Sequence, residues 1–260
     1  MEYINNKKVV LKVQGVSKNF GSVVALNNVS LEIYENEIVG LVGDNGAGKS
    51  TLIKIISGNF PPERGEIYLK GRKVNFKSPE EARHEGIETV YQDLSLCENL
   101  DSISNLFVGR EICKKFFGFK ILQKKEMERK TIEVLNEIDI KIPSVKEKVE
   151  YLSGGQRQAI SLGRFVAWSK KLVLLDEPTA ALGVRETRTA LNLIKRIKNE
   201  KKISMILISH NLQQIFEAVD RIIILRHGEV VGIREKAKTN PDEIVSLITG
   251  AIFIKDENLQ

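Results

Sequence analysis

IVGLVGDNGAGKS, residues Ile38–Ser50, decides the fold of this 260-residue chain. Its first five residues are apolar or glycine, as expected of a strand that is covered on both faces. The next eight, Gly43–Ser50, match GxxxxGK[ST], and a segment with helical periodicity, Lys49–Ser57, follows at once. Strand, glycine-rich loop and helix in this order predict a phosphate-binding loop in an α/β domain.

The chemistry of this loop is specific for phosphate. Glycines let backbone amides turn inward around an anion, and the following helix offers its positive N-terminus. We expect Lys49 to reach the β- and γ-phosphates of ATP and the Ser50 hydroxyl to bind Mg²⁺. An ordinary glycine-rich turn is the alternative, but the flanking strand and helix disfavour it. The predicted ATP contacts here are Gly43, Asp44, Asn45, Gly46, Ala47, Gly48, Lys49, Ser50 and Thr51.

The rest of the chain fits the same architecture. Two more short apolar runs, Lys171–Asp176 and Ile203–Ser209, predict buried strands, whereas the alternating segments Val9–Val13 and Ser30–Tyr34 predict antiparallel edge strands with one wet face. Helical periodicity predicts four further helices at Lys124–Ile138, Gly155–Trp168, Glu186–Lys198 and Asn211–Val219. We therefore predict an α/β fold, a P-loop NTPase (RecA-like) core with an antiparallel β edge.

One part of the chain departs from this pattern. Between Gln92 and about Ala167 the sequence favours helices and gives no convincing strand. We predict an inserted α-helical subdomain at residues 93–167. The ATP-binding core, with an N-terminal β subdomain, then takes residues 1–92 and 168–260.

Two acids end one of the buried runs. Asp176 closes Leu172–Asp176 at the carboxyl end of a strand, where ligands bind in open α/β sheets, and is expected to hold Mg²⁺ directly or through water. Glu177 follows and is free to polarise the attacking water, so we predict that it is the general base. Two solvated acids before a loop are the alternative, which a chain with a phosphate loop disfavours.

A second anion-binding helix start lies at LSGGQ, Leu152–Gln156. Because Gly43–Ser50 already surrounds the phosphates of one nucleotide, we predict that Ser153, Gly154, Gly155 and Gln156 cap the γ-phosphate held by a neighbouring subunit, in a symmetric head-to-tail dimer. The alternative is that Ser153 is only the N-cap of its helix.

Composition excludes several classes of protein. The chain is 42% hydrophobic and 28% charged, and it has no apolar run of roughly 20 residues, so neither a disordered chain nor a membrane-spanning helix is expected. The N-terminus lacks a signal-peptide pattern, which places the chain in the cytoplasm. We expect Cys97 and Cys113 to be reduced thiols, because neither has a histidine at the spacing of a metal site.

The formal net charge of +6 comes mostly from dispersed lysines and arginines, which argues against a nucleic-acid partner. The exception is Lys114–Lys125, where lysine pairs flank Phe116, Phe117 and Phe119. Contact with a membrane protein or with lipid headgroups is one interpretation. Burial of the aromatic rings in an amphipathic subdomain is the commoner outcome and is our prediction.

Together the motifs resemble the ATP-binding subunit of an ABC transporter over nearly the whole length. The phosphate loop, LSGGQ and LLDEP occur in the family order, with Gln92 in VYQD, His210 in LISHN and Phe20 before the phosphate loop. The resemblance implies that Phe20 stacks on adenine, that Gln92 senses Mg²⁺ and water while linking to the membrane subunit, and that His210 contacts the γ-phosphate. The individual alternatives are a core phenylalanine, a surface amide and a satisfied loop histidine.

A finer resemblance lies in EPTAALG, Glu177–Gly183, and the following Val184–Thr187. It is similar to the ATPases of bacterial importers for simple sugars such as ribose, xylose and fructose. Many of these contain two fused copies, whereas this chain resembles the single-copy kind that pairs with itself. Gly183 stands where the general ABC pattern has aspartate, which bears on crosstalk between the two sites and not on hydrolysis.

The resemblance also implies the partners. They are a second ATPase subunit, integral membrane permease subunits at the cytoplasmic face of the membrane and, indirectly, an extracytoplasmic sugar-binding protein. Import of an amino acid, lipid or metal is an alternative. A soluble ABC ATPase of translation or DNA repair is another, although its usual charged linker or long coiled coil is missing. A regulatory protein without turnover would lack Lys49 or Glu177, and both are present.

Overall fold

The computed structural model describes residues 7–90, 96–138, 141–168, 171–180 and 183–251. The chain forms two compact units. The first consists of Met1–Gln92, Ser169–Ala180 and Leu191–Gln260, and the second of Asp93–Trp168 and Ala181–Ala190. Helix α6 (Val184–Lys201) therefore begins in the second unit and continues in the first.

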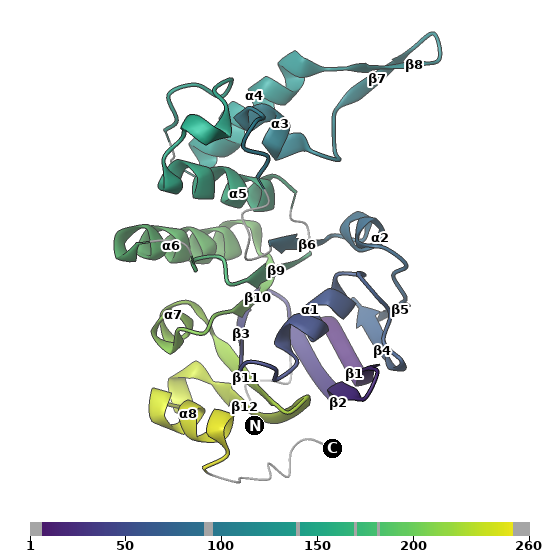
Figure 1. Ribbon diagram of the computed structural model, residues 1–260, viewed down its shortest axis with the longest axis vertical. Helices are drawn as coiled ribbons and strands as arrows, with labels where there is room; N and C mark the ends of the chain where they lie inside the picture. Colours follow the sequence, from purple (N-terminus) through teal and green to yellow (C-terminus); the bar gives the residue numbers. More distant parts are fainter. Residues whose placement is uncertain (1–6, 91–95, 139–140, 169–170, 181–182, 252–260) are drawn as a thin grey trace. The chain divides into compact units, whose positions relative to one another are not determined.

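A six-stranded sheet forms the centre of the first unit (Figure 1). Its order is β12-β11-β3-β10-β9-β6, with β3 (Ile38–Val42), β6 (Ile87–Val90), β9 (Leu172–Asp176), β10 (Ser204–Ile208), β11 (Arg221–Arg226) and β12 (Glu229–Glu235). All neighbours are parallel except β12, which pairs antiparallel with β11. The three apolar runs predicted as buried strands are confirmed and lie side by side as β3, β10 and β9.

A four-stranded antiparallel sheet completes the β structure of this unit. Its order is β2-β1-β4-β5, with β1 (Val9–Phe20), β2 (Val23–Tyr34), β4 (Arg64–Leu69) and β5 (Arg72–Val74). The predicted antiparallel pair is confirmed, but β1 is not an edge strand, because it pairs with β2 on one side and β4 on the other. Adjacent Val10 and Leu11 are both buried, so β1 has no fully wet face.

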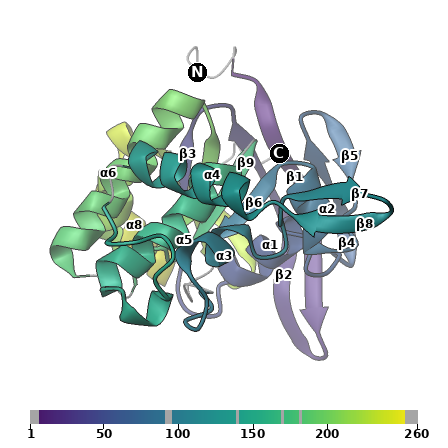
Figure 2. The ribbon, with the colours of Figure 1, turned by 90° about the horizontal axis from the view of Figure 1, so that it is seen from above.

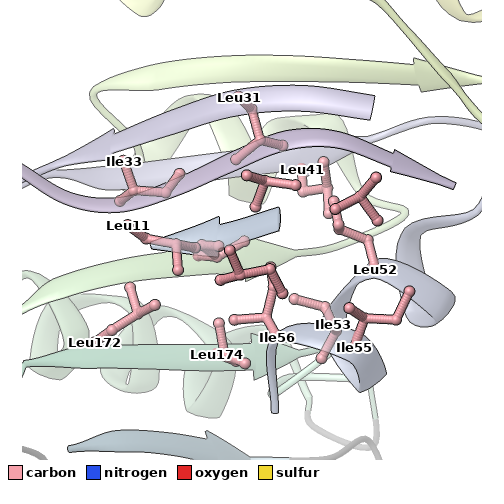
Figure 3. Packing of buried hydrophobic residues seen from close by; sticks show 14 of the residues in the cluster. Leu11, Leu31, Ile33, Leu41, Leu52, Ile53, Ile55, Ile56, Leu172 and Leu174 are labelled. Atoms are coloured by element: carbon pink, nitrogen blue, oxygen red, sulfur yellow. The ribbon is translucent and has the colours of Figure 1, made fainter. Parts of the chain in front are cut away.

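Helices cover the central sheet. Helix α1 (Lys49–Ile56) lies on one face with the four-stranded sheet, while α7 (Leu212–Ala218) and α8 (Pro241–Thr249) lie on the other (Figure 1). A short helix, α2 (Pro79–His84), precedes β6. Figure 3 shows how Leu52, Ile53 and Ile56 of α1 interdigitate with residues of both sheets, so one apolar core fixes the helix that follows the glycine-rich loop.

The second unit is mainly helical, with α3 (Ser102–Phe107), α4 (Lys124–Glu137), the 3₁₀ turn η1 (Val149–Tyr151) and α5 (Gly154–Trp168). Its core contains Leu106, Phe107 and Met127, against which Trp168 packs. The Trp168 ring contacts Phe107 edge-on at 5.3 Å, and its Nε1 donates to the Leu106 carbonyl at 3.1 Å. A second 3₁₀ turn, η2 (Lys236–Lys238), belongs to the first unit.

Two sequence predictions for this segment are wrong. Between α3 and α4 the chain forms an antiparallel hairpin of β7 (Cys113–Phe116) and β8 (Phe119–Leu122), where no strand was expected (Figure 2). The rings of Phe116, Phe117 and Phe119 are exposed and not buried. The tight turn at Phe117 and Gly118 reverses the chain on the surface, so these rings never reach the helical core.

No helix among the residues described here combines the length and the apolar character that crossing a bilayer requires.

Candidate nucleotide-binding site

Three neighbouring strands of the central sheet end at the same edge. In the register of the sheet, Ile208 of β10 lies beside Leu41 of β3 and beside Asp176 of β9. The residues that follow these strands therefore emerge together, as expected for parallel strands at their carboxyl ends. They are the glycine-rich loop after β3, Glu177 after β9 and His210 shortly after β10.

Backbone geometry explains two of the loop glycines. Gly43 and Gly48 have φ values of +152° and +102°. A Cβ on Gly43 would collide with the Leu225 carbonyl, and one on Gly48 would lie 2.5 Å from the Ala25 carbonyl oxygen. Gly46 also has a positive φ, yet no atom lies within 4 Å of a Cβ placed there, so the loop leaves open space at this position.

Lys49 folds back over its own loop. Its Nζ donates to the carbonyl oxygens of Gly43 at 2.6 Å and Asp44 at 2.8 Å. Burial lowers the pKa of Lys49, and the negative charges of Glu177, Asp44 and Asp176 act in the opposite direction. The ammonium group is thus placed at the loop and within the field of both acids that follow β9.

Asp176 and Glu177 have different surroundings. Burial raises the pKa of Asp176, the charge of Glu177 raises it further, and Lys49 and Lys54 oppose the shift. Glu177 has a left-handed φ of +50°, and its backbone N–H donates to the Ile208 carbonyl at 3.0 Å. Such a conformation is unfavourable for a non-glycine residue and concentrates at functional sites. It directs the Glu177 carboxylate towards β10.

Glu177 and His210 lie in direct contact. Glu177 Oε2 is 2.9 Å from His210 Nδ1, while the His210 side chain remains 71% exposed. The ring is therefore held by one nitrogen and presents its other edge to solvent. A carboxylate that orients a histidine in this way also fixes which ring nitrogen carries the proton.

Gln214, at the first turn of α7, joins the two loops that carry these groups. Its Oε1 accepts hydrogen bonds from Thr179 Oγ1 at 2.8 Å and from Ser209 Oγ at 3.0 Å. Thr179 follows β9 and Ser209 follows β10, so one amide fixes the spacing of the segments around Glu177 and His210. Sequence reasoning missed Gln214, because a glutamine in an ordinary helix carries no motif.

The oxygen donors near the loop suit Mg²⁺. This ion takes one or two protein oxygens and completes an octahedron with water and phosphate oxygens. The Ser50 side chain is exposed at the start of α1, and the half-buried Asp176 carboxylate lies within the field of Lys49 from the same loop. Among the residues described, no group of three or more His, Cys, Asp or Glu forms a metal cage of its own. The donor set fits a phosphate-bound Mg²⁺.

Phe20, at the end of β1, is 48% exposed and is therefore not a core residue. Its ring meets Phe60 edge-on at 5.5 Å, and Lys18 Nζ lies 5.3 Å from its centroid. About half of the Phe20 side chain thus remains accessible, and stacking on a base requires an accessible ring.

The LSGGQ segment belongs to the second unit. Ser153 and Gln156 form a reciprocal capping box, in which Ser153 Oγ accepts from the Gln156 N–H at 3.3 Å and Gln156 Oε1 accepts from the Ser153 N–H at 2.9 Å. The N-cap role expected as the alternative for Ser153 is thus present.

No backbone conformation or contact within the described part of the chain requires glycine at positions 154 and 155. Neither has a positive φ, and a Cβ would meet nothing within 4 Å at Gly154 and only Glu186 Cγ, at 3.8 Å, at Gly155. Both glycines lie at the first two positions of α5. The chain therefore keeps two exposed glycines where its own packing does not need them.

One predicted site residue, Gln92, lies outside the described residues. The first unit brings together Lys49, Asp176, Glu177 and His210, and the loop residues Asp44, Asn45 and Gly46 are exposed beside them. Ala47 is buried and Thr51 is half-buried, so these two support the loop from behind.

The family model described as ABC transporter matches residues 26–180. The chain belongs to the ABC transporter family. ABC cassettes bind ATP and hydrolyse it, so the chain is an ATPase of the ABC type. The family resemblance predicted from the motifs is confirmed.

Relatives and solved structures agree with this assignment. The chain is 47% identical to the xylose/arabinose import ATP-binding protein XylG of Sulfolobus acidocaldarius, covering 92% of this chain and 94% of the relative. It is 42% identical to the fructose import ATP-binding protein FrcA of Rhizobium meliloti, covering 93% and 94%. It is also 37% identical to the ribose import ATP-binding protein RbsA of Caldanaerobacter subterraneus, of which it covers 48%.

Among solved structures, a nucleotide-free ATP-binding cassette from an ABC transporter matches with a TM-score of 0.78 at 24% identity, over 93% of this chain and 95% of that one. A dimeric post-hydrolysis cassette bound to ADP and Pi matches with a TM-score of 0.73 at 26% identity, over 87% and 98%. The predicted P-loop NTPase fold is confirmed.

Proposed function

We propose that this chain is the ATP-hydrolysing motor subunit of an importer for a simple sugar. The observation that carries the proposal is the contact of Glu177 with His210 beside Lys49. Lys49 can bind phosphate, and Glu177 can activate water. The names of the relatives, which import xylose and arabinose, fructose or ribose, indicate the class of solute.

Within the site each residue has a distinct task. Lys49 and the backbone amides of its loop bind the β- and γ-phosphates, and the exposed ring of Phe20 stacks on the adenine. Ser50 and Asp176, together with Gln92, would hold Mg²⁺, which would supply positive charge against the phosphates. Glu177 takes a proton from the attacking water, and His210 contacts the γ-phosphate while the carboxylate keeps its ring oriented.

The unit of function is a dimer of this chain. In a head-to-tail pair, the α5 N-terminus of one subunit faces the phosphates that Lys49 of the other binds. The two exposed glycines support this arrangement, because Gly154 and Gly155 let a phosphate approach their backbone amides closely. Closure of the pair excludes water and completes the ring of donors, so assembly gates hydrolysis.

The remaining partners are integral membrane permease subunits, which hold the ATPase at the cytoplasmic face of the membrane and move when the dimer closes. An extracytoplasmic sugar-binding protein delivers the solute to them. We expect no nucleic-acid partner, because the cations are dispersed over most of the chain.

Affinity purification from native membranes in mild detergent tests this function. We expect a permease to co-purify and the ATPase rate to rise with the transported sugar and its binding protein. The Lys49→Ala variant should co-purify equally but hydrolyse no ATP. Recovery of ribosomes or DNA in place of a permease would contradict the transport function and leave only the ATPase.

Mixed dimers test the shared site. A subunit with Ser153→Ala and a subunit with Lys49→Ala should together form one site with both defects and one intact site. We therefore expect about half of the wild-type rate from such pairs. If each subunit used its own Ser153, the lysine variant would disable one site and the serine variant the other.

A further inference from the structure

The β7–β8 hairpin of the second unit presents apolar side chains to solvent. Phe116, Phe117 and Phe119 are 58%, 85% and 76% exposed, and every residue of both strands is exposed. Figures 1 and 2 both show the hairpin reaching outwards from the helices α3 and α4 of the same unit. A contiguous group of exposed large apolar side chains marks an interaction surface.

The register divides the hairpin into two faces, because directly opposed residues of an antiparallel pair share a face. One face carries the opposed pair Phe116 and Phe119, together with Lys114, two residues before Phe116. The other face carries Lys115 directly opposite Lys120. Two like charges in this position repel, so the hairpin is more stable when a polyanion lies against it.

The turn adds a second unfavourable feature. Phe117 and Gly118 have φ values of +47° and +83°, the combination of a type I′ turn, in which asparagine or glycine normally takes the first position. A bulky residue is uncommon in the left-handed region. Phe117, the most exposed phenylalanine among the residues with a described burial, thus lies at a strained tip, where the ring of Phe116 contacts it edge-on at 4.7 Å.

The charge around this tip has one sign. Residues 112–125 contain five lysines and no aspartate or glutamate. In the part of the chain that the structure describes, none of these lysines takes part in an ion pair, whereas Arg129 and Lys130, just beyond them on α4, both do. The five lysines are Lys114, Lys115, Lys120, Lys124 and Lys125.

We propose that this hairpin, residues 112–125, inserts its phenylalanine tip into the interfacial region of an anionic phospholipid bilayer. Exposed aromatic rings partition into that region, and lysines beside them bind the lipid phosphates. Lysines on both faces of a protruding apolar tip complement a fluid anionic surface, whereas a folded protein partner would cover one face. The contact is additional to the proposed function and needs no ATP turnover.

Vesicle flotation of the full chain tests the proposal. We expect binding to vesicles of phosphatidylcholine containing about one third phosphatidylserine, and weak binding to phosphatidylcholine alone. Binding should fall when salt rises from about 0.1 M to about 0.5 M, because salt screens the lysines. In a Phe117→Trp variant, the tryptophan emission should shift to the blue on binding to vesicles. The shift should exceed any change in the wild-type protein, whose only tryptophan is Trp168.

Two multiple-substitution variants separate the contribution of the phenylalanines to lipid binding from that of the lysines. Replacing Phe116, Phe117 and Phe119 by serine should weaken partitioning at least about tenfold. Replacing Lys114, Lys115 and Lys120 by glutamine should weaken it roughly 100-fold, since each lysine near the surface contributes about fivefold. The matched control replaces the exposed Lys8, Lys77 and Lys202 by glutamine, which lowers the net charge equally and should change binding less than about threefold.

The hairpin variants should melt no lower than the wild type and should keep its ATPase rate, because they alter exposed side chains outside the nucleotide site. Failure of lipid binding would therefore leave the proposed function intact. Absence of binding, or equal loss in the control variant, would overturn the proposal. Hairpin-dependent binding that occurs only in vesicles containing the permease would also overturn it, because a protein contact would then be responsible.

Discussion

Replacement of Glu177 by glutamine isolates one chemical role from the geometry around it. Glutamine has the same shape, meets the same strain at φ +50° and keeps an oxygen or amide within reach of His210. The fold and the loop of Lys49 should therefore be unchanged. Only the ability to take a proton from water is lost.

The expected loss follows from that role. A positioned general base contributes roughly 10²–10⁴-fold, and each tenfold change in rate corresponds to about 1.36 kcal/mol, so the barrier should rise by about 3–5 kcal/mol. Removal of a negative charge beside the phosphate site should leave ATP affinity unchanged or increase it. Steady-state kcat, together with binding of a fluorescent ATP analogue, measures both effects.

His210 provides an internal check on this reasoning. If its ring acts in concert with Glu177, His210→Ala should reduce kcat in the wild type and have little further effect in the Glu177→Gln background. Glu35→Gln, at an exposed acid that pairs with Lys70, is the matched control and should keep the wild-type rate. A kcat within threefold of wild type in Glu177→Gln, with ATP still bound, would refute the assignment of the base.

Three further predictions concern stability. Gly43→Ala and Gly48→Ala should lower the melting temperature more than Gly46→Ala. Alanine at any of the three positions adopts a left-handed φ at a cost of about 1–3 kcal/mol, but only at Gly43 and Gly48 does its Cβ also collide with backbone atoms. Equal losses in all three variants would contradict this explanation. Asp176→Asn should raise the melting temperature at neutral pH without nucleotide and Mg²⁺. The folded-state pKa of Asp176 is raised, so its charge destabilises the fold above that pKa and has no effect below the ordinary aspartate pKa. The gain, read by thermal unfolding over a pH series, should disappear on acidification, and a gain that grows there would be contrary to this account. Glu37→Ala should cost about 3–5 kcal/mol in urea unfolding, since it removes a buried carboxylate and leaves Arg221, 2.8 Å away and with a side chain only 12% exposed, without its charge partner. The control Glu35→Ala, which breaks an exposed pair, should cost about 1 kcal/mol or less.

Sequence patterns over a few neighbouring residues correctly predicted those helices and strands whose formation depends mainly on such patterns. The apolar runs at β3, β9 and β10, the helix after the glycine-rich loop and the helix after LSGGQ were placed correctly because burial pattern and turn chemistry act over a few residues. Three features needed more than local information. β1 gained a second partner, β4, from distant sequence, and Gln214 acquired its role only through two loops that meet in space.

The third case is the hairpin, where the run of phenylalanines and lysines was compatible both with a buried amphipathic helix and with an exposed turn. Periodicity in so short a segment cannot separate these, because the outcome depends on whether the surrounding helices leave room for the rings. The helical core is filled by Phe107 and Trp168, and the three phenylalanines remain outside it.

The sequence by itself determined the family and the order of strand, loop and helix, and it predicted the phosphate loop and the two acids of the proposed site, because each depends on residue types at fixed short spacings. Only the tertiary structure decided that Glu177 turns towards His210, that Lys49 lies in the field of both acids and that the hairpin stands in solvent. These features arise where strands far apart in sequence end at one edge of the sheet and where a filled core excludes further side chains. Both depend on contacts between residues far apart in the chain, which the spacing of neighbouring residues does not encode.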